Sequence, residues 1–149
     1  MTMAGSVDYG QLVAAAGDAV VVTDVAGLVT VWNPAAERIF GFTAEEAIGH
    51  SLDMMVPERH RKRHWDAWAA TMETGQTRYG HELLRVPALH KDGRTLSVAF
   101  SIGLIFGPGG AVENVLAIMR DETRRFADEK SLRQRVAELE SGVRVEPTP

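Results

Sequence analysis

The sequence predicts an α+β domain, in which a five-stranded antiparallel sheet carries short helices on one face and is followed by a C-terminal helix. Two β-rich segments near the N-terminus are separated by the turn-forming stretch Asp24-Val25-Ala26-Gly27. Short helical segments fill the middle of the chain, and three further strands follow, separated by Asp92-Gly93 and Pro108-Gly109-Gly110. Strands joined by such turns pair as antiparallel neighbours. Helices that cover one face of such a sheet enclose an apolar space that suits a ligand.

The N-terminal part is expected to contain a short helix and a hairpin. The helix covers residues 9–16 and ends at Gly17. Residues 19–23, Ala-Val-Val-Val-Thr, are mostly β-branched and predict a strand, and residues 28–32 predict its partner. Gly27, at the end of the connecting turn, is free to adopt a positive φ angle.

Two helix starts follow the hairpin. Asn33 is a favourable N-cap residue and Pro34 suits the first helical position, so a helix is expected from there to about Gly41. Thr43 and Glu46 are three residues apart and form a capping box, which predicts the start of a second short helix.

The second half of the chain contains the longest predicted elements. Pro57 starts a helix for which Gly75 provides the C-cap. In order, we expect a helix over residues 57–74, strands over residues 78–88, 95–106 and 112–119, and a helix over residues 122–140.

Composition narrows the class of protein. The 149 residues correspond to one domain with a short tail. The net charge of −4 argues against a general nucleic-acid-binding protein, which usually carries a basic surplus. The N-terminus lacks the pattern of a signal peptide and no apolar run is long enough to cross a bilayer, so we expect a cytoplasmic protein with no membrane partner. The absence of cysteine excludes disulfides, thiolate metal sites and a covalent flavin–cysteine adduct.

Six motifs occur along the chain in one order. They are the turn at residues 24–27, Trp32-Asn33-Pro34-Ala35-Ala36 with Phe40-Gly41, Ile48-Gly49, Val56-Pro57, Lys91-Asp92-Gly93 and Arg120-Asp121-Glu122-Thr123. In this order they resemble the PAS family across nearly the whole of residues 8–126. The resemblance implies the PAS fold and a sensory or protein-interaction module, often homodimeric, upstream of an output protein or domain such as a histidine kinase.

The resemblance also suggests how the chain is organised. We expect a disordered N-terminus over residues 1–7, a PAS sensor domain over 8–123, an amphipathic signalling helix over 124–141 and a tail over 142–149. Too few residues follow Thr123 for a kinase, a cyclase or a DNA-binding domain. We therefore expect either a fragment of a longer protein or a sensor that acts on a separate partner.

The helix that begins at Pro57 carries the candidate ligand. His60, His64 and Trp68 are spaced four residues apart and share a helix face. In haem-binding PAS proteins of the oxygen-sensing kinase type, the iron ligand is a histidine on this helix, in an arginine-x-arginine-histidine context after a proline-glutamate start. Residues 57–64, Pro-Glu-Arg-His-Arg-Lys-Arg-His, are similar to that context. This resemblance implies b-type haem, His64 as the ligand of the metal, and a diatomic gas or the redox state as the signal.

One position departs from that subfamily. An ungapped count places Leu84 where the subfamily carries an arginine that hydrogen-bonds bound oxygen. Its neighbour Arg85 is expected on the opposite face of the strand. Phe100, Ile102 and Leu104 alternate on the next strand and predict an apolar wall. The expected cofactor-binding residues are His64, Trp68, Met72, Leu84, Phe100, Ile102 and Leu104.

The sequence leaves other interpretations open. Trp65 and Trp68 are large enough to fill the space that a porphyrin needs, which would make the chain a ligand-free interaction and dimerisation module. Alternatively, the pocket binds another apolar small molecule. His60 and His64 lack a third ligand of obvious spacing, which argues against zinc. The basic run over residues 59–63 is explained by a solvated helix face, and no constellation of catalytic residues predicts an enzyme.

The C-terminal helix is expected to link the domain to a partner. Leu132, Val136 and Leu139 follow the four-then-three spacing of a coiled-coil seam. A short isolated helix is marginally stable in water, so this one is expected to pair with a second copy or to lie on the sheet of its own domain, giving a weak homodimer. Because it continues from the last strand, we also expect it to transmit the state of the pocket.

Overall fold

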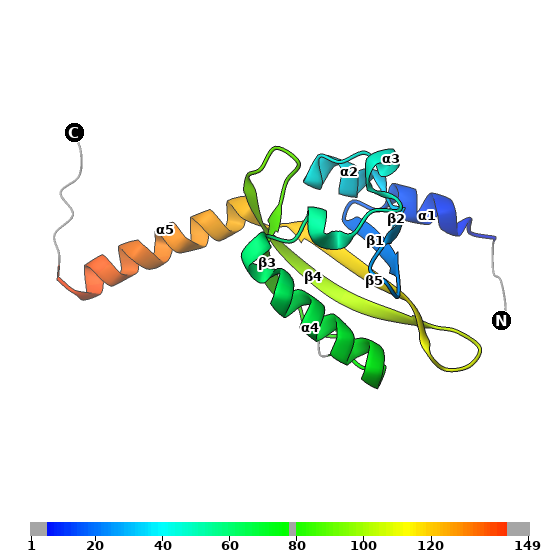
Figure 1. Cartoon of the computed structure of the whole chain (residues 1–149). Helices are drawn as coiled ribbons and strands as arrows, with labels where there is room; N and C mark the ends of the chain where they lie inside the picture. Colours follow the sequence, from blue (N-terminus) through cyan, green and yellow to red (C-terminus); the bar gives the residue numbers. More distant parts are fainter. Residues whose placement is uncertain (1–5, 78–79, 143–149) are drawn as a thin grey trace.

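The computed structural model describes residues 6–77 and 80–142, which contain a five-stranded antiparallel sheet with the strand order β2-β1-β5-β4-β3 (Figure 1). The strands are β1 (Ala19–Asp24), β2 (Val29–Trp32), β3 (Leu84–Leu89), β4 (Thr95–Phe106) and β5 (Val112–Asp121). All four neighbouring pairs are antiparallel, so the predicted α+β sheet is confirmed. Residues 1–5 and 143–149, most of the expected disordered N-terminus and of the expected tail, lie outside the described residues.

The helices are α1 (Tyr9–Ala15), α2 (Pro34–Phe40), α3 (Ala44–Ala47), the 3-10 helix η1 (Leu52–Met54), α4 (Glu58–Thr74) and α5 (Thr123–Glu140). The starts of α2 and α3 and the end of α4 coincide with the caps that the sequence predicts. Asn33 caps α2, since its side-chain oxygen accepts a hydrogen bond from the backbone N–H of Ala36 at 3.0 Å. Thr43 and Glu46 form the capping box of α3. Gly75 ends α4 in the left-handed region, with φ of 67°.

β3 is shorter than the strand predicted over residues 78–88. Residues 78–79 lie outside the described part of the chain, and residues 80–83 form a bend that leads into Leu84. Gly80, His81 and Glu82 have little preference for extended structure. The pairing of β3 with β4 accordingly begins at the Leu84–Phe100 pair, and beyond that pair β4 is paired with β5 alone.

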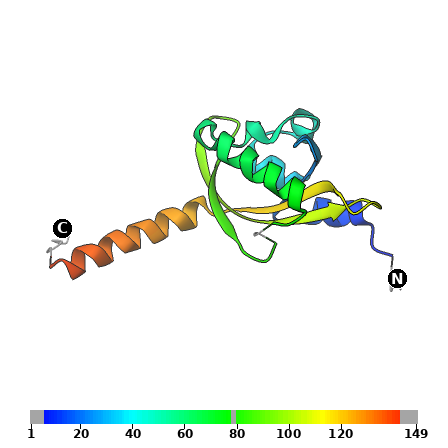
Figure 2. The same cartoon turned by 60° about the horizontal axis from the view of Figure 1, so that its bottom comes forward.

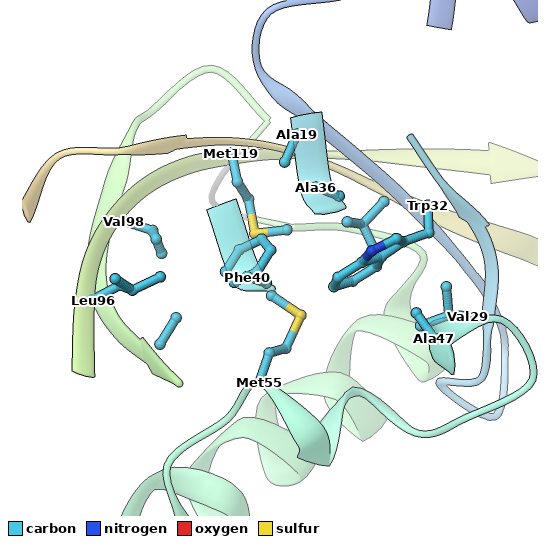
Figure 3. Close-up of a cluster of buried hydrophobic side chains, with 12 residues drawn as sticks. Ala19, Val29, Trp32, Ala36, Phe40, Ala47, Met55, Leu96, Val98 and Met119 are labelled. Atoms are coloured by element: carbon cyan, nitrogen blue, oxygen red, sulfur yellow. The ribbon is translucent and has the colours of Figure 1, made fainter. Parts of the chain in front are cut away.

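The helices α2, α3 and α4 cover one face of the sheet, which we call the inner face (Figure 2). The core lies where α2 meets this face. Phe40 of α2 is fully buried, and around it lie side chains from the strands and from the segment after η1 (Figure 3). They include Trp32, Met55, Leu96, Val98 and Met119. Removing a buried phenylalanine side chain of this kind typically costs about 3–5 kcal/mol, so this cluster holds the helices on the sheet.

α5 projects away from the sheet in both views (Figures 1 and 2). Its start is tied to β4, because the N–H of Glu122 donates to the carbonyl of Ser97 at 2.8 Å and the N–H of Ser97 donates to Oγ1 of Thr123 at 3.0 Å. Beyond its first turns the helix is exposed. Of the two packings expected for it, lying on the sheet of its own domain is therefore wrong. Among the described helices, none combines the length and the apolar character needed to span a membrane.

Candidate functional site

α4 runs along β4 and is attached near both of its ends (Figure 1). Just before the helix, the carbonyl of Met55 accepts a hydrogen bond from the N–H of Leu89, at the end of β3, at 2.9 Å. Just after the helix, the ring of Phe106, at the end of β4, lies 3.6 Å from where a Cβ on Gly75 would be. The two ends of α4 are therefore anchored to the sheet at the end of β3 and at the end of β4.

The packing between α4 and the sheet is looser than the packing of the core. None of the 17 described residues of α4 is fully buried. The helix has one half-buried face, made of His60, Arg61, His64, Trp65, Trp68, Thr71 and Met72. In β4, Leu96 and Val98 are buried, whereas residues 100–104 are only half-buried. The apolar surfaces of α4 and of the second half of β4 are therefore only partly covered by protein.

The sheet side of this region is an apolar wall. Leu84 pairs with Phe100 across β3 and β4, and paired residues of an antiparallel sheet share a face. Ile102 and Leu104 follow at two-residue intervals on that same inner face. Arg85 leaves the opposite face, where its Nη1 lies 3.0 Å from Oε2 of Glu129 in α5. The alternation expected for Leu84 and Arg85 is thus observed, and the guanidinium is directed away from the inner face.

His64 lies on the half-buried face of α4, in contact with two indoles. Its ring centroid is 4.6 Å from that of Trp65, edge-on at 77°, and 5.9 Å from that of Trp68. Its Nδ1 is buried and has no hydrogen-bond partner among the described residues. Buried polar atoms in native proteins are nearly always satisfied, so an orphaned ring nitrogen calls for an explanation.

Burial also sets the charge state of His64. Desolvation lowers the pKa of the imidazole below its ordinary value of 6.5, and the nearby carboxylate of Asp53 acts weakly in the opposite direction. The ring is therefore neutral at neutral pH. Neutral imidazole is the form that binds a metal ion through a ring nitrogen.

The two tryptophans beside His64 make polar contacts on the side of the β1–β2 turn. Nε1 of Trp65 donates to Oδ1 of Asp53, in η1, at 2.7 Å. Nε1 of Trp68 donates to the carbonyl of Val25, in the turn, at 2.9 Å. Their ring centroids are 5.4 Å apart. Both indoles are thus bound to the first part of the domain, whereas the apolar wall is formed by its second part.

The predicted site residues fall into two groups in the structure. His64, Trp68 and Met72 share the half-buried face of α4. Leu84, Phe100, Ile102 and Leu104 share the inner face of the sheet. Asp53 and Gly27 were not predicted to belong to the site, although both contact Trp65. Their separation from α4 in the sequence hides these contacts, and only the turn-forming character of Gly27 was visible.

A site made only of protein ligands is not present in the part of the chain that the structure describes. No three His, Asp or Glu side chains there are grouped so that they could hold a metal ion. Nε2 of His60 accepts a hydrogen bond from Nε of Arg59 at 3.2 Å, and no further such side chain joins His60 and His64 in a metal-binding group among the described residues. A metal bound by His64 would need most of its other ligands from a cofactor. A porphyrin supplies them, and a half-covered apolar wall suits it, so the residues present fit a haem.

Two curated relatives of the chain are sensor proteins by name. Sensor protein FixL of Bradyrhizobium diazoefficiens is 30% identical over 123 residues, which are 82% of this chain and 24% of FixL. Oxygen sensor protein DosP of Escherichia coli is 29% identical over 106 residues, which are 71% of this chain and 13% of DosP. The chain therefore spans less than a quarter of the length of each of these relatives.

Solved structures share the fold. A PAS domain from Colwellia psychrerythraea has a TM-score of 0.68 and 26% identity, and the match covers 78% of this chain and 95% of that one. An RNA-binding light-oxygen-voltage receptor also has a TM-score of 0.68, with 20% identity over 87% of this chain and 36% of the receptor. At that lower identity the receptor shows the likeness of the fold alone.

The family follows from a match over most of the described domain. The PAS fold model matches residues 8–121, which include α1 to α4 and all five strands. The match agrees with the order of the six sequence motifs and with the antiparallel sheet order β2-β1-β5-β4-β3. The chain belongs to the PAS family, whose domains are sensory modules of signal transduction.

Proposed function

We propose that this chain is a PAS sensory module that binds b-type haem through His64 and responds to a diatomic gas or to the redox state of the iron. The observation that carries the proposal is the neutral, half-buried imidazole of His64, whose buried Nδ1 lacks a partner among the described residues. A ring of this kind on a helix that packs loosely against an apolar wall has the character of an axial ligand.

Residues of α4 and residues of the sheet would contact the cofactor from two sides. His64 would hold the iron, and Trp68 and Met72 would contact the porphyrin from α4. From the sheet, the apolar wall of Leu84, Phe100, Ile102 and Leu104 would cover it. When bound, haem iron supplies a second axial position at which a small gas molecule can bind.

The relatives support this choice of signal without extending to the whole protein. One relative is named as an oxygen sensor and another as a sensor protein, and each matches most of this chain. We propose that this PAS domain has no enzymatic activity of its own and passes its signal to an output protein or domain, such as a histidine kinase. A homodimer formed through α5 belongs to the same proposal.

Reconstitution with hemin tests the assignment of His64. Titration of the purified apoprotein with hemin should produce a sharp Soret band at one equivalent. The band should be lost or strongly broadened in His64→Ala, and it should persist in His60→Ala, the matched control one helical turn away. A wild-type protein that takes up no hemin, or loss of the band in His60→Ala alone, contradicts the proposal.

A ligand-free dimerisation module is the second candidate. It is favoured by the apolar side chains along α5, since Leu132, Val136 and Leu139 are 60%, 51% and 73% exposed. In that case Trp65 and Trp68 serve only to pack α4 against the rest of the domain, through the hydrogen bonds that they already make. A colourless protein that rejects hemin and still self-associates would favour this second function.

A further inference from the structure

We propose that Asp53 and Gly27 are positioning residues for His64: they hold the indole of Trp65 from two sides, and that indole sets the orientation of the imidazole. The inference deepens the proposed function and rests on it for its biological meaning. The contacts that carry it lie within the protein itself, so it can be tested before any cofactor is added.

The indole of Trp65 is held at both of its edges. On one edge, Nε1 donates to Oδ1 of Asp53 at 2.7 Å. On the other edge, the six-membered ring lies against Gly27, where an added Cβ would be 2.3 Å from Cη2 and 2.6 Å from Cζ3. Gly27 also has a φ of 80°, which other residues rarely adopt. Glycine is therefore required at this position both for the backbone and for the indole.

Asp53 is itself held in place by neighbouring segments. Its backbone N–H donates to Oγ of Ser51 at 3.1 Å, and its carbonyl accepts from Nη2 of Arg61, in α4, at 3.1 Å. The N–H of Leu52 donates to the carbonyl of Gly27 at 3.2 Å. The β1–β2 turn, η1 and the first turns of α4 thus form one hydrogen-bonded unit, and Trp65 lies inside it.

The imidazole of His64 depends on this unit because it packs edge-on against the indole of Trp65 at 4.6 Å. No hydrogen bond to Nδ1 among the described residues orients the ring. Packing against the indoles is therefore what selects its rotamer. If the Trp65 indole moves, the space beside the imidazole changes and other rotamers of His64 become accessible.

The test begins with the apoprotein, labelled with ¹³C at histidine, with the His64 resonances assigned by their absence in His64→Ala. Asp53→Leu removes the acceptor for Trp65 and should shift and broaden the His64 ring signals. Asp53→Asn keeps an acceptor oxygen and should leave them close to wild type. The matched control is Asp66→Asn. Asp66 is an exposed carboxylate on α4, the helix that carries His64, and it is paired with Lys62, so its substitution should leave the His64 signals unchanged.

The holoprotein gives the second readout, which is the rate of hemin loss to a scavenger protein. With other rotamers of His64 accessible, fewer imidazole rings are oriented to hold the iron, so Asp53→Leu should release hemin on the order of tenfold faster. The Soret position should shift in the same variant and should not shift in Asp66→Asn. Gly27→Ala, which displaces the indole from its other edge, should reproduce both effects.

The outcomes separate the two proposals. Unchanged His64 resonances in a folded Asp53→Leu protein overturn the positioning role, whatever hemin does. Equal shifts in Asp53→Leu and Asp53→Asn also overturn it, because the hydrogen-bond acceptor would not then be what matters. If Asp53→Leu does not fold, Gly27→Ala decides by the same resonances. A wild-type protein that rejects hemin defeats the proposed function alone.

Discussion

His64 pairs an apolar setting with a titratable ring, which gives the folded protein a measurable dependence on pH. Burial lowers the pKa of the imidazole below its ordinary value of 6.5, so His64 binds a proton less readily in the folded state than in the unfolded state. As the pH falls below about 6.5, the unfolded chain binds a proton first and becomes relatively more stable. Stability that is present above the unfolded pKa is therefore lost as the pH falls through the lower folded pKa.

We expect the free energy of unfolding of the apoprotein to fall more steeply between pH 7 and pH 5 in wild type than in His64→Phe. The difference in slope cannot exceed about 1.4 kcal/mol per pH unit, the limit for a single proton. Urea denaturation at a series of pH values measures it. His50→Gln, at an exposed histidine, is the control and should follow wild type. Parallel curves for wild type and His64→Phe would show that the ring is not desolvated.

Leu84 leads to a second prediction, which depends on haem binding. It lies on the inner face and offers no hydrogen-bond donor to a partly negative ligand of the iron. The ferrous protein should therefore bind carbon monoxide stably and oxidise quickly in air. Leu84→Arg should slow the oxidation by about tenfold, in line with a charge-assisted hydrogen bond. Arg85→Leu removes a guanidinium from the opposite face and should leave the rate of oxidation unchanged. If Arg85→Leu altered that rate as much as Leu84→Arg, the assignment of the two residues to opposite faces would be wrong.

At the level of single residues, the sequence predicted which side of a strand each residue occupies, but not which other residues it contacts. Alternation along β4 placed Phe100, Ile102 and Leu104 on one side because a strand has a period of two residues. The burial of His64 Nδ1 and the hydrogen bond between Trp65 and Asp53 could not be read in the same way. Both depend on the tertiary position of α4 relative to η1 and the β1–β2 turn, which no local pattern specifies.

Among the secondary-structure elements, α2 depends most on a single cap. The side-chain oxygen of Asn33 accepts from the N–H groups of Val20 and Ala36, and its Nδ2 donates to the carbonyls of Val13 and Asp18. The residue is buried, so a substitution leaves several of these groups without partners. One side chain thus joins α1, β1 and α2.

Asn33→Ala should lower the free energy of unfolding by about 2–4 kcal/mol, since each buried group left unsatisfied costs about 1–3 kcal/mol and water replaces some of the lost bonds. Thr43→Ala removes the exposed cap of α3 and should cost only about 1 kcal/mol. Urea denaturation of both variants at neutral pH provides the comparison. Similar losses for the two would indicate that the contacts of Asn33 beyond its own helix contribute little.

The same capping signals explain why helix boundaries were predictable and the start of β3 was not. Asn33, Thr43 and Gly75 act through atoms within a few residues of themselves, so their sequence context is sufficient. The start of β3 depends instead on tertiary structure: β4 continues as a strand to Phe106, yet β3 joins it only at the Leu84–Phe100 pair. Where the chain first meets the edge of β4 is a property of the assembled sheet.

For the whole molecule, the exposed stripe on α5 predicts self-association. Leu132, Val136 and Leu139 are all more than half exposed, and an exposed apolar seam on a helix is stabilised by pairing with a second one. The full chain should sediment as a weak dimer, and a version ending at Thr123 should sediment as a monomer. Val136→Glu should abolish the dimer, whereas Gln134→Glu, off the seam, should not. Monomers at high concentration of the full chain would rule out this contact.

The way α5 leaves the sheet has a mechanical consequence. The helix has 18 residues, so at about 1.5 Å per residue it is a rigid arm about 27 Å long. Its pivot is small, since it consists of the bonds to Ser97 and the ion pair between Arg85 and Glu129. A tilt of about 5° at the pivot displaces the far end by about 2 Å, because the arm multiplies the angle by its length. A shift in β4 that is too small to alter its strand pairing would therefore move the far end of α5. That movement would be large enough to change the side-chain contacts that α5 makes with a partner.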